Sequence, residues 1–275
     1  MRREDAQAEE LYRHHRGPSV LCYPNVPTAR HVLGRIAKRL ELRVSRKPGR
    51  EPDLAVRFER QAEVARQYRQ LRDVDCVVVN GQLRGSGKHL VADAFYDAFD
   101  YPLAVDPTTH EGPLVEKSNR NAQHDGRVVL GPIEPVPGKV YTVLVDNEDG
   151  DEVVDFRCPV IGETIPFVYE KRQPLSDRFG QSGATDRVVA LRDPTEVFSA
   201  TEIDRILTMA RVLGADLAEL DVLRDRSSGR IYIVDANPTA AARWSWATDE
   251  QARWAVDVLA ATFEAEFLVP DASVI

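Results

Sequence analysis

Hydrophobic and polar residues follow strand-like and helix-like spacing in turn along the first third of the chain. Residues 20–25 form a short apolar run, and Pro27-Thr28 precedes a stretch whose apolar residues recur at helical spacing. Two further apolar runs, 54–58 and 74–79, predict strands. Residues 1–82 are therefore expected to form a small N-terminal α/β lead-in domain.

Strands are expected to dominate the middle of the chain, after a helix over residues 88–99. Short strands are predicted at 101–105, 113–117, 127–130, 140–145 and 153–169. A polar segment with glycine and serine at 172–186 predicts an exposed loop.

The C-terminal third has the clearest helix signal. Ser199-Ala-Thr-Glu202 is a capping-box pattern, and Gly214 ends the apolar repeat that follows it. Residues 219–237 predict two strands joined by a turn, and 249–268 an amphipathic helix. The chain as a whole is thus expected to be α/β, of the α+β kind, without internal repeats.

Composition narrows the functional classes. The 275 residues carry a formal net charge of −8, so the chain is not a basic nucleic-acid clamp, and anionic ligands would need local basic sites. No apolar run approaches the ~18 residues of a membrane helix, and the N-terminus is charged, so a cytoplasmic protein is expected. Cys22, Cys76 and Cys158 are odd in number and far apart, which argues against disulfides and a cysteine metal site.

The strand pair at 219–237 carries the most informative polar residues. In an antiparallel pair, a three-residue loop at Ser227–Gly229 would place Asp221 opposite Asp235. Asn237 would point the same way as Asp235, because side chains alternate along a strand. Leu223, Ile231 and Ile233 would lie on the same face, as an apolar floor beside the acids.

Two facing carboxylates raise each other's pKa unless a cation lies between them. Oxygen donors of this kind suit Mg²⁺ holding a polyphosphate. The alternative is that Asp221, Asp235 and Asn237 are ordinary polar residues of a solvated hairpin.

The sequence Asp221-Val-Leu-Arg, followed by Ile-Val-Asp235-Ala-Asn237-Pro-Thr, resembles the metal-binding hairpin of the ATP-grasp superfamily. The pattern is most similar to the branch of glutathione synthetases and ribosomal-protein glutamate ligases. The resemblance implies an ATP-grasp fold in which Asp221, Asp235 and Asn237 hold the magnesium ions that bridge the ATP phosphates. The family usually has glutamate where this chain has Asp235.

The same resemblance assigns roles upstream of the hairpin. Arg157 would contact the transferring phosphoryl group, Arg172 would be a second phosphate-side arginine, and Arg178 is a candidate substrate contact. Each arginine has the plainer alternative of pairing with a neighbouring acid or with solvent. Nucleotide contacts implied by the resemblance are Lys88, Lys117, Asn121, His124 and Gly126, with the backbone of Val143, Leu144 and Val145 as the adenine hinge.

Gly85-Ser-Gly87-Lys88 superficially suggests a P-loop, but that pattern needs glycine at Gln82 and Ser or Thr at His89. The resemblance instead divides the chain into the lead-in domain, a central nucleotide-covering subdomain at 83–145 and a C-terminal subdomain at 146–275.

The implied activity is an ATP- and Mg²⁺-dependent ligase that joins a small carboxylate to an amine or thiol through an acyl phosphate. Arg243 and Trp244 are candidate acceptor contacts. The expected partners are small-molecule substrates, with no nucleic acid and no membrane, and a homodimer is left open. Two alternatives remain: an ATP-grasp kinase with a stable phosphorylated product, and a nucleotide-binding protein without catalysis.

Overall fold

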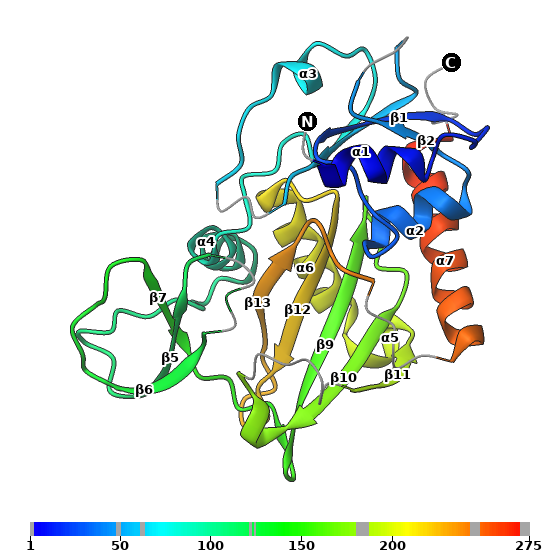
Figure 1. The fold of residues 1–275 in the computed structure, drawn as a ribbon. Coiled ribbons are helices and arrows are strands. Elements are labelled where there is room, and N and C mark those ends of the chain that lie inside the picture. The colour runs from blue at the N-terminus through cyan, green and yellow to red at the C-terminus, as the bar shows by residue number, and fades with distance from the viewer. Residues whose placement is uncertain are drawn as a thin grey trace.

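The computed structural model describes residues 3–47, 51–60, 64–120, 123, 125–179, 187–242 and 248–269. Its strands form three sheets, which Figure 1 shows as an upper layer, a tall central sheet and a small sheet at one side.

The upper layer is the N-terminal unit. Its parallel sheet has the order β2-β1-β3-β4. The elements are α1 (Arg3–Glu10), β1 (Ser19–Pro24), α2 (Val32–Arg39), β2 (Arg43–Ser45), β3 (Leu54–Phe58), α3 (Arg69–Arg72) and β4 (Val78–Val79). The strand expected at 74–79 is shorter in the structure. Only Val78 and Val79 pair with β3, and they form β4 at the edge of the sheet.

The central sheet is antiparallel, with the order β11-β10-β9-β12-β13 and β8 paired to β9. Its strands are β8 (Glu148–Asp149), β9 (Glu152–Ile161), β10 (Val168–Pro174), β11 (Arg187–Arg192), β12 (Leu217–Arg224) and β13 (Ile231–Asn237). The run expected at 153–169 thus divides into β9 and the start of β10, with Gly162 at φ +58° where β9 ends.

The small sheet has the order β6-β5-β7 and consists of β5 (Gly112–Ser118), β6 (Arg127–Gly131) and β7 (Lys139–Val143). The strand expected at 101–105 is absent from the described residues, where only Ala104 forms an isolated bridge, to Thr142. Pro102 lacks the backbone N–H that a regular ladder needs.

One face of the central sheet is covered by helices. The covering helices are α4 (Lys88–Phe99), α5 (Pro194–Val197) and α6 (Ala200–Leu213). Ile206 and Met209 of α6 are fully buried in one core with Val222 of β12 and Phe95 of α4. We call this the covered face and the opposite side the open face. As predicted, Ser199 and Glu202 form a reciprocal capping box at the start of α6.

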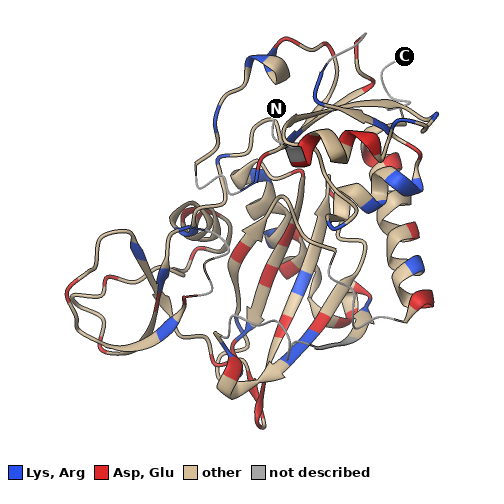
Figure 2. Ribbon diagram, in the orientation of Figure 1, with Lys and Arg blue, Asp and Glu red and all other residues tan. Residues whose placement is uncertain are grey.

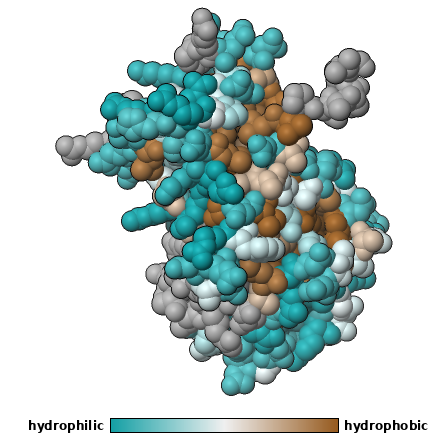
Figure 3. Space-filling model, turned by 90° about the vertical axis from the view of Figure 1, so that its right-hand side faces the viewer, coloured by the Kyte–Doolittle hydropathy of each residue, from teal (hydrophilic) through white to brown (hydrophobic). Residues whose placement is uncertain are grey.

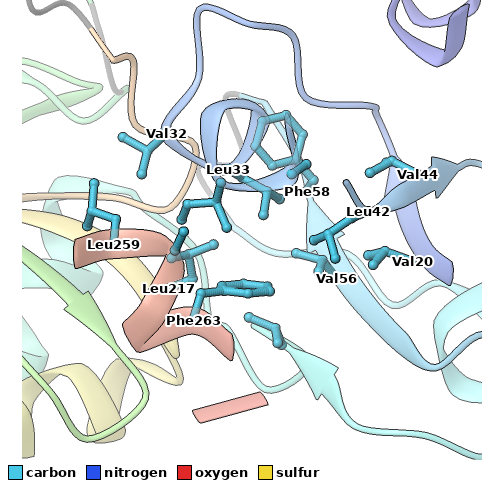
Figure 4. Packing of buried hydrophobic residues seen from close by; sticks show 14 of the residues in the cluster. Val20, Val32, Leu33, Leu42, Val44, Val56, Phe58, Leu217, Leu259 and Phe263 are labelled. Carbon is cyan, nitrogen blue, oxygen red and sulfur yellow. The ribbon is translucent and has the colours of Figure 1, made fainter. Parts of the chain in front are cut away.

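The last helix, α7 (Asp249–Phe267), joins the N-terminal unit to the central sheet. Leu259 and Phe263 point from α7 toward Leu33 of α2 and Leu217 of β12 (Figure 4). This packing removes several large apolar side chains from water, each contributing roughly 1.5–3 kcal/mol. It fixes the N-terminal unit above one end of the open face.

Apolar side chains also reach the surface near this helix. Trp254 of α7 is 46% exposed and Val269, just beyond it, is 59% exposed. Figure 3 shows hydrophobic residues gathered between hydrophilic regions on that side of the molecule. Among the described helices, none combines the length and the apolar character that crossing a bilayer requires.

Gly214 ends α6 at φ +73°, and a Cβ there would lie 2.3 Å from the Gln82 carbonyl oxygen. Gly229 has φ +72° with nothing within 4 Å of an added Cβ. We expect Gly229→Ala to cost about 1 kcal/mol from backbone conformation alone. Gly214→Ala should cost at least about 1 kcal/mol more, because the clash is with backbone. Urea unfolding of both variants measures the difference; equal losses would contradict it.

Candidate functional site

The two acids of the C-terminal hairpin face each other, as the sequence predicts. Asp221 of β12 is directly opposite Asp235 of β13, and Glu219 is opposite Asn237. Because directly opposed residues share a face and side chains alternate along a strand, all four project from the open face. Figure 2 shows charged residues in the middle of β9, β12 and β13.

The register arises differently from the prediction. The pairing shifts by one residue at Val234, which has no partner in β12, while Val222 pairs with Ile233. Such a β-bulge supplies the offset that the predicted three-residue loop would have supplied. The actual connection is longer, because Asp225 N–H donates to the Arg230 carbonyl at 2.8 Å. The prediction that Ile231 and Ile233 lie on the same face as the acids is therefore wrong, because both are buried on the covered face.

Each acid of the pair contacts a cation. Arg157 of β9 donates to both carboxylate oxygens of Asp221, from Nε at 2.8 Å and from Nη2 at 3.1 Å. Lys88, the first residue of α4, forms an ion pair with Asp235 Oδ1. Burial opposes charge on Asp221, but Arg157, Lys171 and Lys88 together hold its pKa below the usual value. The Asp221 carboxylate raises the pKa of Arg157 further above its usual value, against burial.

Glu219 is a site residue that the sequence analysis did not single out. It is 3% exposed, and its Oε2 accepts no hydrogen bond from the described residues, with Arg157 Nη1 3.7 Å away. Burial, with a further contribution from Asp221, raises the pKa of Glu219 to about 7 despite Arg157. The available signal was its position two residues before Asp221 on the same strand, which puts both on one face.

Lys117 connects the small sheet to the bulge. From β5, its Nζ donates to the Val234 carbonyl at 3.1 Å. Burial and the neighbouring charge of Lys88 lower the pKa of Lys117 to about 8, although Asp235 and Asp221 act in the opposite direction. The two predicted nucleotide lysines, which are 29 positions apart in the sequence, therefore both lie beside Asp235.

Arg172 is not placed as predicted. In β10, Tyr169 is opposite Arg157 and Lys171 is opposite Asp155, so Lys171 lies on the open face. Arg172 is opposite Val154 and lies on the other face, where it pairs with Asp149 at 2.6 Å and Glu170 at 3.1 Å. Side chains alternate between the two faces along β10, so Lys171 lies on the open face and Arg172 does not.

Arg178 fastens a loop to the predicted adenine hinge. Its guanidinium donates to the Val145 carbonyl and, at 2.6 Å, to Asn147 Oδ1. At the other end of the hinge, Val143 N–H donates to the Leu103 carbonyl at 3.0 Å. The Val145 carbonyl and the Val143 N–H are thus already hydrogen-bonded within the protein, and Arg178 contacts Val145 and Asn147 in the structure.

Gly126 lies against this same loop, because a Cβ at that position would come 2.7 Å from Cδ1 of Phe179. The hairpin between β5 and β6 therefore reaches the segment that follows β10. The other predicted contacts, Asn121, His124, Arg243 and Trp244, lie outside the described residues.

The donor atoms of this site are oxygens, the kind of ligand that a hard cation such as Mg²⁺ prefers. Asp221, Asp235 and Asn237 offer carboxylate and amide oxygens on one face, and the buried Glu219 carboxylate beside them has an oxygen without a hydrogen bond. Within the described ranges, no three His, Cys, Asp or Glu side chains are grouped closely enough to hold a metal. Asn237 Oδ1 accepts from Thr239 N–H at 3.3 Å. The acids are balanced by Arg157 and Lys88.

Comparison with solved structures identifies the fold. A RimK-domain ATP-grasp protein from Sphaerobacter thermophilus is similar over 91% of this chain and 100% of its own, with 13% identity and a TM-score of 0.53. The ATP-grasp ligase PsnB, solved with precursor peptide PsnA2 and AMPPNP, matches over 89% of this chain and 96% of its own, with 12% identity and a TM-score of 0.53. The chain therefore has the ATP-grasp fold that the sequence predicts.

The likeness does not extend to sequence. No protein-family sequence model matches the chain, and no curated protein sequence matches it.

Three further structures of PsnB match this chain over only part of their length. The match spans 63–64% of the PsnB chain, with TM-scores of 0.44–0.46.

The lowered pKa of Lys117 predicts a pH-dependent stability. Its pKa is about 8 in the folded chain and 10.5 ordinarily, so below pH 8 both states are protonated and the full penalty of burying the charge applies. Between these values the unfolded chain binds more protons, and stability rises with pH. We expect Lys117→Met to raise the free energy of unfolding at neutral pH by on the order of 1–3 kcal/mol.

This gain should shrink as the pH rises from 8 toward 10.5. Urea unfolding of wild type and variant across this range measures it. Lys38→Met, which removes an exposed lysine of α2, is the control. A difference between wild type and Lys117→Met that does not change with pH would refute the buried-charge explanation.

Proposed function

We propose that this protein is an ATP- and Mg²⁺-dependent ligase that joins a carboxylate to an amine or thiol through an acyl phosphate. The observation that carries the proposal is the facing pair Asp221 and Asp235 on the open face, with Lys88 and Lys117 on one side and Arg157 on the other. The ATP-grasp fold of the chain is consistent with it, and PsnB, with the same fold, is a ligase by name.

Lys88 and Lys117 would bind the nucleotide phosphates. Both are largely buried next to Asp235, so a phosphate would meet ammonium groups that have lost much of their hydration. In the structure their charge is balanced by Asp235 and Asp221. A bound complex of a metal ion with a polyphosphate would replace both sets of partners: the metal ion would pair with the two acids, and the phosphates would pair with the two lysines.

Asp221, Asp235 and Asn237 would hold Mg²⁺, which neutralises charge on the phosphates during transfer. With its carboxylate engaged as a metal ligand, Asp221 would no longer hold Arg157, whose guanidinium would then be available to the terminal phosphoryl group. The binding of metal and nucleotide would therefore be cooperative. A metal on Asp221 would free Arg157 for the phosphates, and phosphates on Lys88 would free Asp235 for the metal.

The reaction has two steps. An oxygen of the substrate carboxylate bonds to the γ-phosphorus while the bond to the β–γ bridging oxygen breaks and ADP leaves. The amine nitrogen then bonds to the acyl carbon, the carbon–oxygen bond to phosphate breaks, and the amine proton passes to solvent. Arg157 stabilises the transferring phosphoryl group by its planar pair of N–H donors, and no covalent nucleophile from the protein is needed.

Calorimetry of ATP binding with and without Mg²⁺ tests the site. For Asp235→Asn we expect the magnesium-dependent part of the affinity to fall at least ~10-fold while the fold is kept, because a carboxylate ligand is lost. Asp257→Asn, in an exposed ion pair on α7, is the control. Wild-type affinity in Asp235→Asn would refute the proposed metal site.

A second measurement separates the classes of reaction. Phosphate release from ATP is followed with a panel of carboxylates, including amino acids and an acidic peptide, each with and without added amines. A ligase releases phosphate only when both a carboxylate and an amine or thiol are present. A stable phosphorylated product would identify a kinase, and Mg-ATP binding without turnover on any substrate would identify a non-catalytic nucleotide-binding protein.

A further inference from the structure

A small cavity lies where the N-terminal unit meets the open face of the central sheet. Its walls come from α2, β3, β9, β12 and α7 and are mostly apolar. Five of the apolar lining residues are labelled in Figure 4: Val32, Leu33, Phe58, Leu217 and Leu259. The free space is that of roughly one water molecule, so the cavity can take only a small group.

Glu219 of β12 is the charged side chain among the described residues that line this cavity. It is 3% exposed, and its Oε2 accepts no hydrogen bond from the described residues. Arg157 Nη1 is 3.7 Å from that oxygen, but the same guanidinium already donates to both oxygens of Asp221. A carboxylate buried in this way has lost its hydration, and a cationic N–H donor beside it would replace the lost contacts.

An organic ammonium fits this position better than a metal ion does. A hard cation needs several oxygen ligands at short range. No three His, Cys, Asp or Glu side chains in the described part of the chain are grouped that closely, and hydrocarbon makes up most of the cavity wall. An alkyl ammonium has N–H donors for the carboxylate and carbon atoms for the apolar wall.

Glu219 also lies next to the group that would hold the transferring phosphoryl. Arg157 is opposite Asp221 in the pairing of β9 with β12, and its Nη1 is 3.7 Å from Glu219 Oε2. An amine paired with Glu219 is therefore close to an acyl phosphate held by Arg157. A thiolate would be repelled by the Glu219 carboxylate, and a neutral thiol is only a weak hydrogen-bond donor.

We propose that Glu219 binds the ammonium group of the amine substrate, and that the cavity takes a small alkyl group attached to it. The second substrate of the ligase is then a small primary amine and not a thiol. The inference rests on the proposed function and names a substrate class for the same site. Glu219 binds the amine, and the proton that the amine loses passes to solvent.

The test is the binding of ethylamine to the full chain saturated with Mg-ADP, at about pH 8, where an alkyl ammonium keeps its proton. Nuclear magnetic resonance of the ligand measures the dissociation constant, and ethanethiol and ethanol are probes of similar size. Wild type should bind ethylamine at least about 10-fold more tightly than either probe, because only the ammonium forms a charge-assisted contact.

Two variants separate the charge from the cavity. Glu219→Gln keeps the size of the side chain and removes its charge, so it should weaken ethylamine binding by about 10-fold or more. Val32→Ile adds one methylene to the cavity wall and should weaken ethylamine binding by about 3-fold or more. Glu196→Gln, at an exposed glutamate of α5, controls for net charge and should bind ethylamine as wild type does.

The role of Glu219 would be refuted by equal binding of ethylamine and ethanethiol to wild type, or by unchanged ethylamine binding in Glu219→Gln. A loss of Mg-ADP affinity in Glu219→Gln as large as that in Asp235→Asn would make Glu219 a metal ligand instead. Unchanged binding in Val32→Ile would refute the role of the cavity. Failure of wild type to bind Mg-ADP would overturn the proposed function as well, and it is distinguishable because this step is measured first.

Discussion

The structure of the site depends on one electrostatic constraint, the opposition of Asp221 and Asp235 across β12 and β13. Two carboxylates on neighbouring strands repel each other and lose hydration, so the fold must supply positive charge nearby. Arg157 reaches Asp221 from the adjacent strand β9, and Lys88 reaches Asp235 from the start of α4. Helix α4 therefore has two roles at the edge of the sheet: Lys88 balances the charge of Asp235, and Phe95 packs in the core.

Much of this could be read from the sequence. The facing acids, the capping box at Ser199 and the approximate bounds of β5, β9 and α4 follow from local patterns of side chains. The proximity of Lys88 and Lys117 was available only through a resemblance to a known fold, since nothing in the spacing of residues 88 and 117 brings them to Asp235. Long-range contacts of this kind arise from topology, and local periodicity carries no information about them.

The features that sequence reasoning missed concern which face a side chain occupies. Ile231, Ile233 and Ala236 are buried, and the three-residue interval between the last two breaks the period of two, which was a visible sign of the bulge at Val234. No such sign distinguishes Lys171 from Arg172, because the choice depends on how β10 pairs with β9. A displacement of one residue exchanges the two, so an assignment by alignment alone is fragile at this strand.

The contact between Lys117 and the Val234 carbonyl has a consequence for the motion of the protein. It ties the small sheet to the central sheet before any nucleotide arrives. A nucleotide bound as proposed would replace the Val234 carbonyl with its own phosphate oxygens as the partner of this ammonium. If the proposed function is right, the Lys117 ammonium would therefore keep a hydrogen-bond acceptor both before and after the nucleotide binds.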